Sequence, residues 1–119
     1  MALEKRIGFY ECVFIMRQDI APQDVHKAAD NFVQLLDGFK KDLIKKEYWG
    51  LRALAHIINK NKKGHYVMLG LEAEPAAILE LERHFKISED VLRYISLRRE
   101  SIDQSPSPMM SAPSDLKTA

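Results

Sequence analysis

The stretch IGFYECVFIMR, residues 7–17, is rich in aromatic and β-branched side chains, and this composition predicts a β-strand. Successive side chains of a strand point to opposite faces, so Tyr10, Cys12 and Phe14 share one face with Met16. The odd-numbered positions share the other face. Both faces are largely apolar, and the strand is therefore expected to be central in its sheet.

Two later segments have the periodicity of amphipathic helices. Residues 22–36 place apolar side chains at helical spacing, with Pro22 at the favoured first position and Gly38 as a stop signal. A second such segment begins at Pro75 and runs to Phe85. Each helix has one apolar face that must be buried against the sheet.

Three further strands complete the expected sheet. Residues 40–59 are extended with a bend or bulge at Gly50, and the polar residues 59–64 are expected to form a hairpin tip. Residues 65–73 and 91–98 are the remaining strands. The order β-α-β-β-α-β predicts an α+β, ferredoxin-like fold, a four-stranded antiparallel sheet with two helices on one face.

The length of 119 residues fits one domain, which we assign to residues 1–99. Residues 100–119 contain five Ser and three Pro without periodicity, so we expect a tail that is disordered when free. The N-terminus lacks the apolar segment of a signal peptide, and no apolar run approaches the ~20 residues of a membrane span. These features predict a cytoplasmic protein without a membrane partner.

No pattern in the sequence predicts catalysis, a metal or a cofactor. The four histidines are scattered, and no pair has the spacing of a metal site. Cys12 is the only cysteine, so an intramolecular disulfide is excluded, and its place in a strand indicates a buried apolar residue rather than a nucleophile. We therefore expect a protein that is not an enzyme.

Positive charge is concentrated in the middle of the chain. The net charge is only +1, yet residues 39–66 contain eight Lys and Arg against two acidic residues. Such a block favours binding to a polyanion, although a solvated hairpin would have the same composition. Arg52 is the first candidate for phosphate binding because a guanidinium can donate two parallel hydrogen bonds, unless it only pairs with Glu47 or braces the bulge. The other candidates are Lys45, Lys46, Lys60, Lys62 and Lys63.

The sheet face opposite the helices is expected to be apolar. Alternation assigns to it Val13, Ile15, Tyr66, Met68, Ile95 and Leu97. An apolar open face indicates a protein partner, a homodimer or stacked bases. Base stacking is disfavoured, because Met68 stands where an RNP1-type octamer would have an aromatic residue.

Five segments of the chain have distinctive motifs: FYECVFI (9–15), KEYWGLRALAHII (46–58), KKGHYV (62–67), AAILELE (76–82) and ISEDVLRY (87–94). Together they resemble the bacterial small-subunit ribosomal protein S6 family. Two of them, a Trp-Gly-Leu-Arg segment and a Gly-His-Tyr segment, are specific in combination. Small departures are His56, where that family usually has tyrosine, and Ala53, where a polar residue is common.

The resemblance implies a structural constituent of the 30S subunit that binds rRNA. It also implies a partnership with ribosomal protein S18, with which the family binds the central domain of small-subunit rRNA beside other 30S components. Two other hypotheses remain open from the residues alone. One is an RNA chaperone acting by itself, and the other is a small dimeric ligand-binding module on the same fold.

Overall fold

The structure, a computed structural model, describes residues 6–111 and contains a four-stranded antiparallel sheet in the order β2-β3-β1-β4. The expected order of strands and helices is confirmed and fits a ferredoxin-like arrangement, with one short helix more than predicted. The elements are β1 (Gly8–Arg17), α1 (Pro22–Gln34), β2 (Lys41–Ile58), β3 (Asn61–Ala73), α2 (Pro75–Ile87), β4 (Val91–Arg99) and α3 (Pro108–Ser111).

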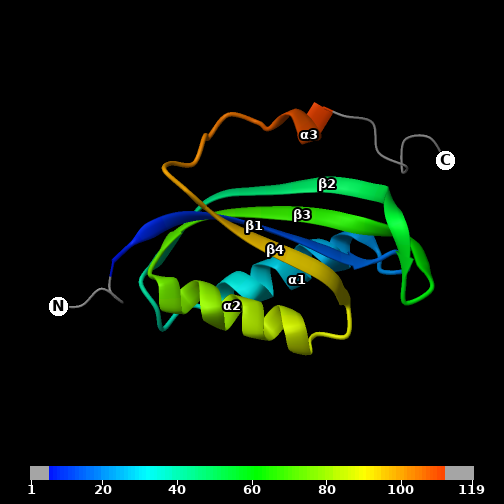
Figure 1. The fold of residues 1–119 in the computed structure, drawn as a ribbon, viewed down its shortest axis with the longest axis horizontal. Helices are drawn as coiled ribbons and strands as arrows, with labels where there is room; N and C mark the ends of the chain where they lie inside the picture. Colours follow the sequence, from blue (N-terminus) through cyan, green and yellow to red (C-terminus); the bar gives the residue numbers. More distant parts are fainter. Residues whose placement is uncertain (1–5, 112–119) are drawn as a thin grey trace.

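The core lies between the sheet and helices α1 and α2, whereas α3 lies on the other side of the sheet (Figure 1). Phe14 of β1 is fully buried there, and its ring centroid lies 5.4 Å from that of Phe32 on α1 and 4.9 Å from that of Phe85 on α2. Burial alternates along β1, with the even-numbered side chains in the core. The odd-numbered side chains therefore belong to the other side, which we call the outer face.

Several boundaries differ from the sequence prediction, and helix α2 continues to Ile87, two residues beyond its predicted end. Helix α1 ends at Gln34, and the chain continues in tighter turns before Gly38. The hairpin turn consists of Asn59 and Lys60 only, both with positive φ (47° and 67°), and β3 begins at Asn61 rather than at residue 65. A two-residue turn with positive φ matches the twist of the two strands, and Ile58 pairs with Asn61 beside it. Residues 54–57 of β2 bulge out of register between this pair and the pair of Ala53 and Lys63.

A bulge interrupts β2 at Gly50, as the sequence predicts. The pairing of β2 with β3 shifts register between Tyr48 and Gly50, and Gly50 has a φ of 92°. Only glycine adopts this backbone conformation without strain.

Replacing Gly50 by Ala is expected to lower the free energy of unfolding by about 1–3 kcal/mol, because a β-carbon would strain the backbone at positive φ. The midpoint of urea denaturation measures this loss. Gly38→Ala is the matched control, since a β-carbon at Gly38 would meet no atom within 4 Å. Equal midpoints for the two variants would contradict the role of the bulge.

The chain after β4 does not leave the domain. Residues 100–107 run back over the outer face and lead into α3, which contacts β2 (Figure 1). Ile102 is only 9% exposed, so part of the segment predicted as a disordered tail is packed in this structure. The rest of the predicted tail, residues 112–119, and the first five residues of the predicted domain lie outside the described residues.

Candidate nucleic-acid interface

The structure divides the six predicted phosphate-binding residues into three groups. Lys60, Lys62 and Lys63 are exposed at the end of the β2–β3 hairpin. Lys46 lies toward the helices, where its ammonium is 2.7 Å from the carboxylate of Asp30 on α1. Lys45 and Arg52 form the third group, and both contact the C-terminal segment on the outer face.

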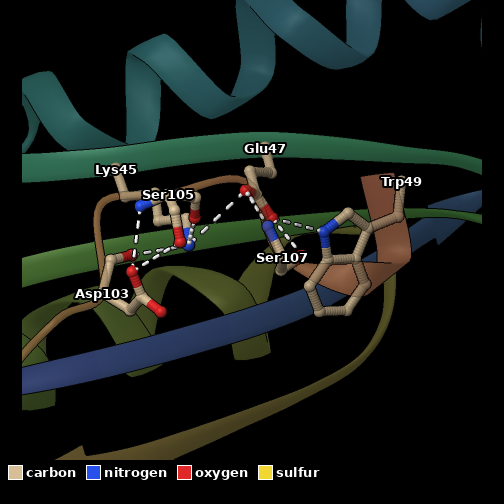
Figure 2. Close-up of polar contacts among 6 residues, drawn as sticks. All are labelled: Lys45, Glu47, Trp49, Asp103, Ser105 and Ser107. Carbon is tan, nitrogen blue, oxygen red and sulfur yellow. Dashed lines mark hydrogen bonds and ion pairs between the residues drawn. The ribbon is translucent and has the colours of Figure 1, made fainter. Parts of the chain in front are cut away.

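Lys45 is bound to the C-terminal segment through its ammonium group. Its Nζ donates hydrogen bonds of 2.7 Å to the carbonyl oxygens of both Asp103 and Ser105, and it lies 3.6 Å from the carboxylate of Glu47 (Figure 2). The side chain of Lys45 is only 9% exposed. In this conformation its ammonium is directed to the chain's own carbonyl groups.

Arg52 donates hydrogen bonds to the bulge and to the C-terminal segment. Its Nε donates to the carbonyl oxygen of Trp49 at 2.8 Å, and its Nη2 donates to that of Met109 at 3.0 Å. The first of these bonds spans the bulge at Gly50, which supports the alternative that Arg52 braces the bulge. Its role in phosphate binding stays a prediction.

Replacing Arg52 by Ala separates the two roles. If Arg52 binds phosphate, we expect assembly with rRNA and a partner protein to weaken by roughly 1.5–3 kcal/mol, as a lost charge-assisted hydrogen bond would. Affinity is measured by filter binding, and thermal unfolding is measured on the same sample. Unchanged affinity with a lower melting temperature would leave only the bracing role.

The six residues predicted for a partner-protein face lie on three adjacent strands. Val13 of β1 pairs with Met68 of β3 on one side and with Ile95 of β4 on the other, and Ile15 pairs with Tyr66. Leu97 follows Ile95 by two residues and shares its face. The expected grouping on the outer face is therefore present, while its role in binding stays a prediction.

Exposure of these six side chains is uneven. Ile95 is 54% exposed and Leu97 is 43% exposed, whereas Met68 is 3% exposed. The part of the outer face on β4 is therefore accessible, Val13, Ile15 and Tyr66 are half-buried, and Met68 on β3 is covered.

A shallow pocket at the hairpin end of the outer face contains residues that the sequence analysis did not select. Arg93 lies opposite Ile15 in the pairing of β4 with β1, and it follows the same alternation as Ile95, which could have identified it. The pocket is lined by Ile15, Leu54, Ala55, His56, Ile58, Tyr66 and Arg93.

Glu47 is a second residue that the sequence analysis did not select. It is 5% exposed and accepts hydrogen bonds from Trp49 Nε1 (2.9 Å), the Ser107 amide (3.0 Å) and Ser107 Oγ (2.6 Å) (Figure 2). Burial raises the pKa of Glu47, but the hydrogen bonds from Ser107 and Trp49 and the charge of Lys45 outweigh it and lower the pKa below its usual value. Glu47 is therefore an ionised anchor for the C-terminal segment.

The side chain of Cys12 is placed for packing in the core. Cys12 is fully buried, and burial raises the pKa of its thiol to about 11, so a nucleophilic thiolate is disfavoured. Within residues 6–111, no group of three or more His, Cys, Asp or Glu side chains could hold a metal ion. In the same part of the chain, no helix has the length and apolar character needed to cross a membrane.

Comparison with known proteins gives consistent matches. A family model described as "Ribosomal protein S6" matches residues 9–98. The small ribosomal subunit protein bS6 of Rickettsia bellii (strain OSU 85-389) is 45% identical over 104 residues, covering 87% of each chain. The protein of the same name from Granulibacter bethesdensis is 48% identical over 106 residues, covering 89% of this chain and 69% of that protein.

One solved structure supports the fold. The crystal structure of 30S ribosomal protein S6 from Thermotoga maritima has a TM-score of 0.72 to this chain and covers 79% of it and 89% of that chain. The sequence identity is 21%, so this likeness supports the architecture alone.

Proposed function

Because this chain belongs to the ribosomal protein S6 family, whose members are structural proteins rather than enzymes, we propose that it is a structural constituent of the small ribosomal subunit. In this role it binds the central domain of small-subunit rRNA together with ribosomal protein S18. The observation that carries the proposal is the continuity of a basic hairpin end with an apolar sheet face. Lys62 and Tyr66 are four residues apart on β3, so both lie on the outer face.

Exposed lysines at the hairpin end support the contact with rRNA. Lys60, Lys62 and Lys63 project from the segment that holds the positive charge of the chain. Phosphate contacts by lysine are chiefly electrostatic and position a protein on RNA without reading its sequence. This fits a scaffold that recognises an RNA surface.

The accessible part of the outer face supports a protein partner. Ile95 and Leu97 expose apolar surface beside Val13, which pairs with Ile95. Exposed apolar patches are costly in water unless another surface covers them. A protein such as S18 would cover this patch and bring its own basic residues to a joint RNA surface.

Reconstitution tests the proposal. The purified chain, S18 and a central-domain rRNA fragment are expected to form one complex, and in a cell lysate the chain is expected to co-sediment with 30S particles at moderate salt. Recovery of many unrelated RNAs without a protein partner would instead indicate an RNA chaperone. A free homodimer that is absent from ribosomes would indicate a ligand-binding module.

The isolated chain is expected to be folded but to bind rRNA weakly. Its net charge is +1, and its acidic segments oppose association with a polyanion. Affinity for the rRNA fragment, measured by filter binding, should rise at least about tenfold when S18 is added. Tight and specific rRNA binding by the purified chain alone would contradict this prediction.

A further inference from the structure

The segment of residues 102–109, here called the strap, is anchored at its start by one apolar side chain. Ile102 is 9% exposed and packs on Gly70 of β3. A β-carbon at Gly70 would lie 3.0 Å from Cγ2 of Ile102 and 3.1 Å from Cβ of Lys45, so the missing side chain lets the strap approach the sheet. This contact lies on the outer face, over the pair formed by Lys45 and Gly70.

A buried carboxylate anchors the middle of the strap. Both the amide and the hydroxyl of Ser107 donate to the carboxylate of Glu47 (Figure 2). Trp49 Nε1, which lies on β2 as Glu47 does, donates a third hydrogen bond to it. Hydrogen bonds to an ionised acceptor are stronger than those between neutral groups. The strap is therefore held by specific bonds as well as by apolar packing.

The strap also occupies two cations of the basic segment. Lys45 donates to two strap carbonyl oxygens, and Arg52 donates to the carbonyl oxygen of Met109. The carbonyl oxygens of the strap accept hydrogen bonds from the same donors that a phosphate group would need. The exposed carboxylate of Asp103 is near enough to Lys45 to interact with its charge, and it would repel a phosphate group.

On the basis of the proposed function, we propose that the strap masks Lys45 and Arg52 from rRNA and must leave the outer face before these two cations bind phosphate. The closed strap and the bound RNA are then mutually exclusive. Apparent affinity for RNA is reduced by the fraction of molecules in which the strap is open. RNA binding and strap release become coupled steps of assembly.

Trp49, the only tryptophan in the chain, reports on the strap without reference to RNA. In the full chain, Ser107→Ala removes the hydroxyl hydrogen bond to Glu47, and Ile102→Asp removes the apolar anchor. Each variant is expected to shift Trp49 emission to the red and increase its quenching by acrylamide. Gln104→Ala is the matched control, because Gln104 is an exposed strap residue. Emission that is identical in all four proteins would overturn the proposal.

Affinity for the central-domain rRNA fragment in the presence of S18 tests the masking itself. Ser107→Ala should bind about tenfold more tightly than wild type, the gain expected when about a tenth of the molecules are open. In a Lys45→Met background this gain should shrink. A gain of equal size in that background, or weaker binding by Ser107→Ala, would overturn the proposal.

Failure of the proposed function gives a different result. If wild type and variants all fail to bind the rRNA fragment while Trp49 emission still changes, the function is wrong and the masking role falls with it. If all bind with equal affinity, the function stands and only the strap proposal is overturned.

Discussion

The variant Ile15→Asp is expected to lose association with S18 while its domain stays folded. Ile15 lies on the outer face, opposite Tyr66 of β3 and Arg93 of β4, whereas the neighbouring even-numbered residues fill the core. Central positions of an interface contribute most to affinity, and β1 is an inner strand of the sheet. A carboxylate at this place would be desolvated against an apolar partner.

The expected loss of affinity is at least about 100-fold. Burial of one apolar side chain stabilises an interface by roughly 1.5–3 kcal/mol at best, and the desolvation of a charge adds to the loss. Isothermal titration with S18 measures the affinity, and circular dichroism reports whether the domain is folded.

Phe14→Asp is the matched control for this experiment. It introduces the same carboxylate one residue away, but into the core between the rings of Phe32 and Phe85. This variant should unfold, since a buried unpaired charge costs several kcal/mol. A collapsed spectrum for Ile15→Asp would refute the assignment of the faces, and S18 binding as tight as that of wild type would refute the docking role of the outer face.

The parts of the fold that follow from periodicity could be predicted from the sequence. In β1 a period of two separates Phe14, in the core, from Ile15, on the outer face. The bulge at Gly50 was also predictable, because glycine inside a strand indicates a backbone conformation that other residues avoid. In each case a local pattern carries the structural information.

The strap could not be predicted in this way. Its packing depends on one apolar residue, Ile102, and on hydrogen bonds between Ser107 and Glu47, which are 60 residues apart in the chain. No repeat in residues 100–111 indicates these contacts. The Ser- and Pro-rich composition indicates a large loss of conformational entropy when the segment becomes ordered. It contains no information on the contacts of Ile102 and Ser107 with the sheet, which offset that loss.

The contacts of the strap also explain why charge alone could not distinguish among the candidate phosphate-binding residues. Counting lysines treats Lys45 and Lys62 as equivalent members of one basic block. The structure distinguishes them, because the side chain of Lys45 is 9% exposed and donates to carbonyl oxygens of the strap, while Lys62 stays exposed near the turn. The accessible charge for a first encounter with RNA is therefore at the hairpin end.

Replacing Lys60, Lys62 and Lys63 together by Gln is accordingly expected to produce the largest change in the salt dependence of RNA binding. Each lysine–phosphate contact releases counterions and contributes roughly 0.7–0.9 to the slope of log affinity against log salt concentration. Loss of three contacts should reduce the magnitude of that slope by about 2 to 3. The slope is measured with the S18 complex and the central-domain rRNA fragment.

A control for this triple variant removes charge elsewhere. Lys27→Gln with Lys86→Gln changes exposed lysines on α1 and α2, away from the hairpin, and should leave the slope nearly unchanged. Folding of both variants is checked by circular dichroism, because exposed substitutions of this kind usually change stability by less than about 0.5 kcal/mol. A slope for the triple variant equal to that of wild type would show that the hairpin end does not contact phosphate, and RNA binding would then have to depend on Lys45, Arg52 and the release of the strap.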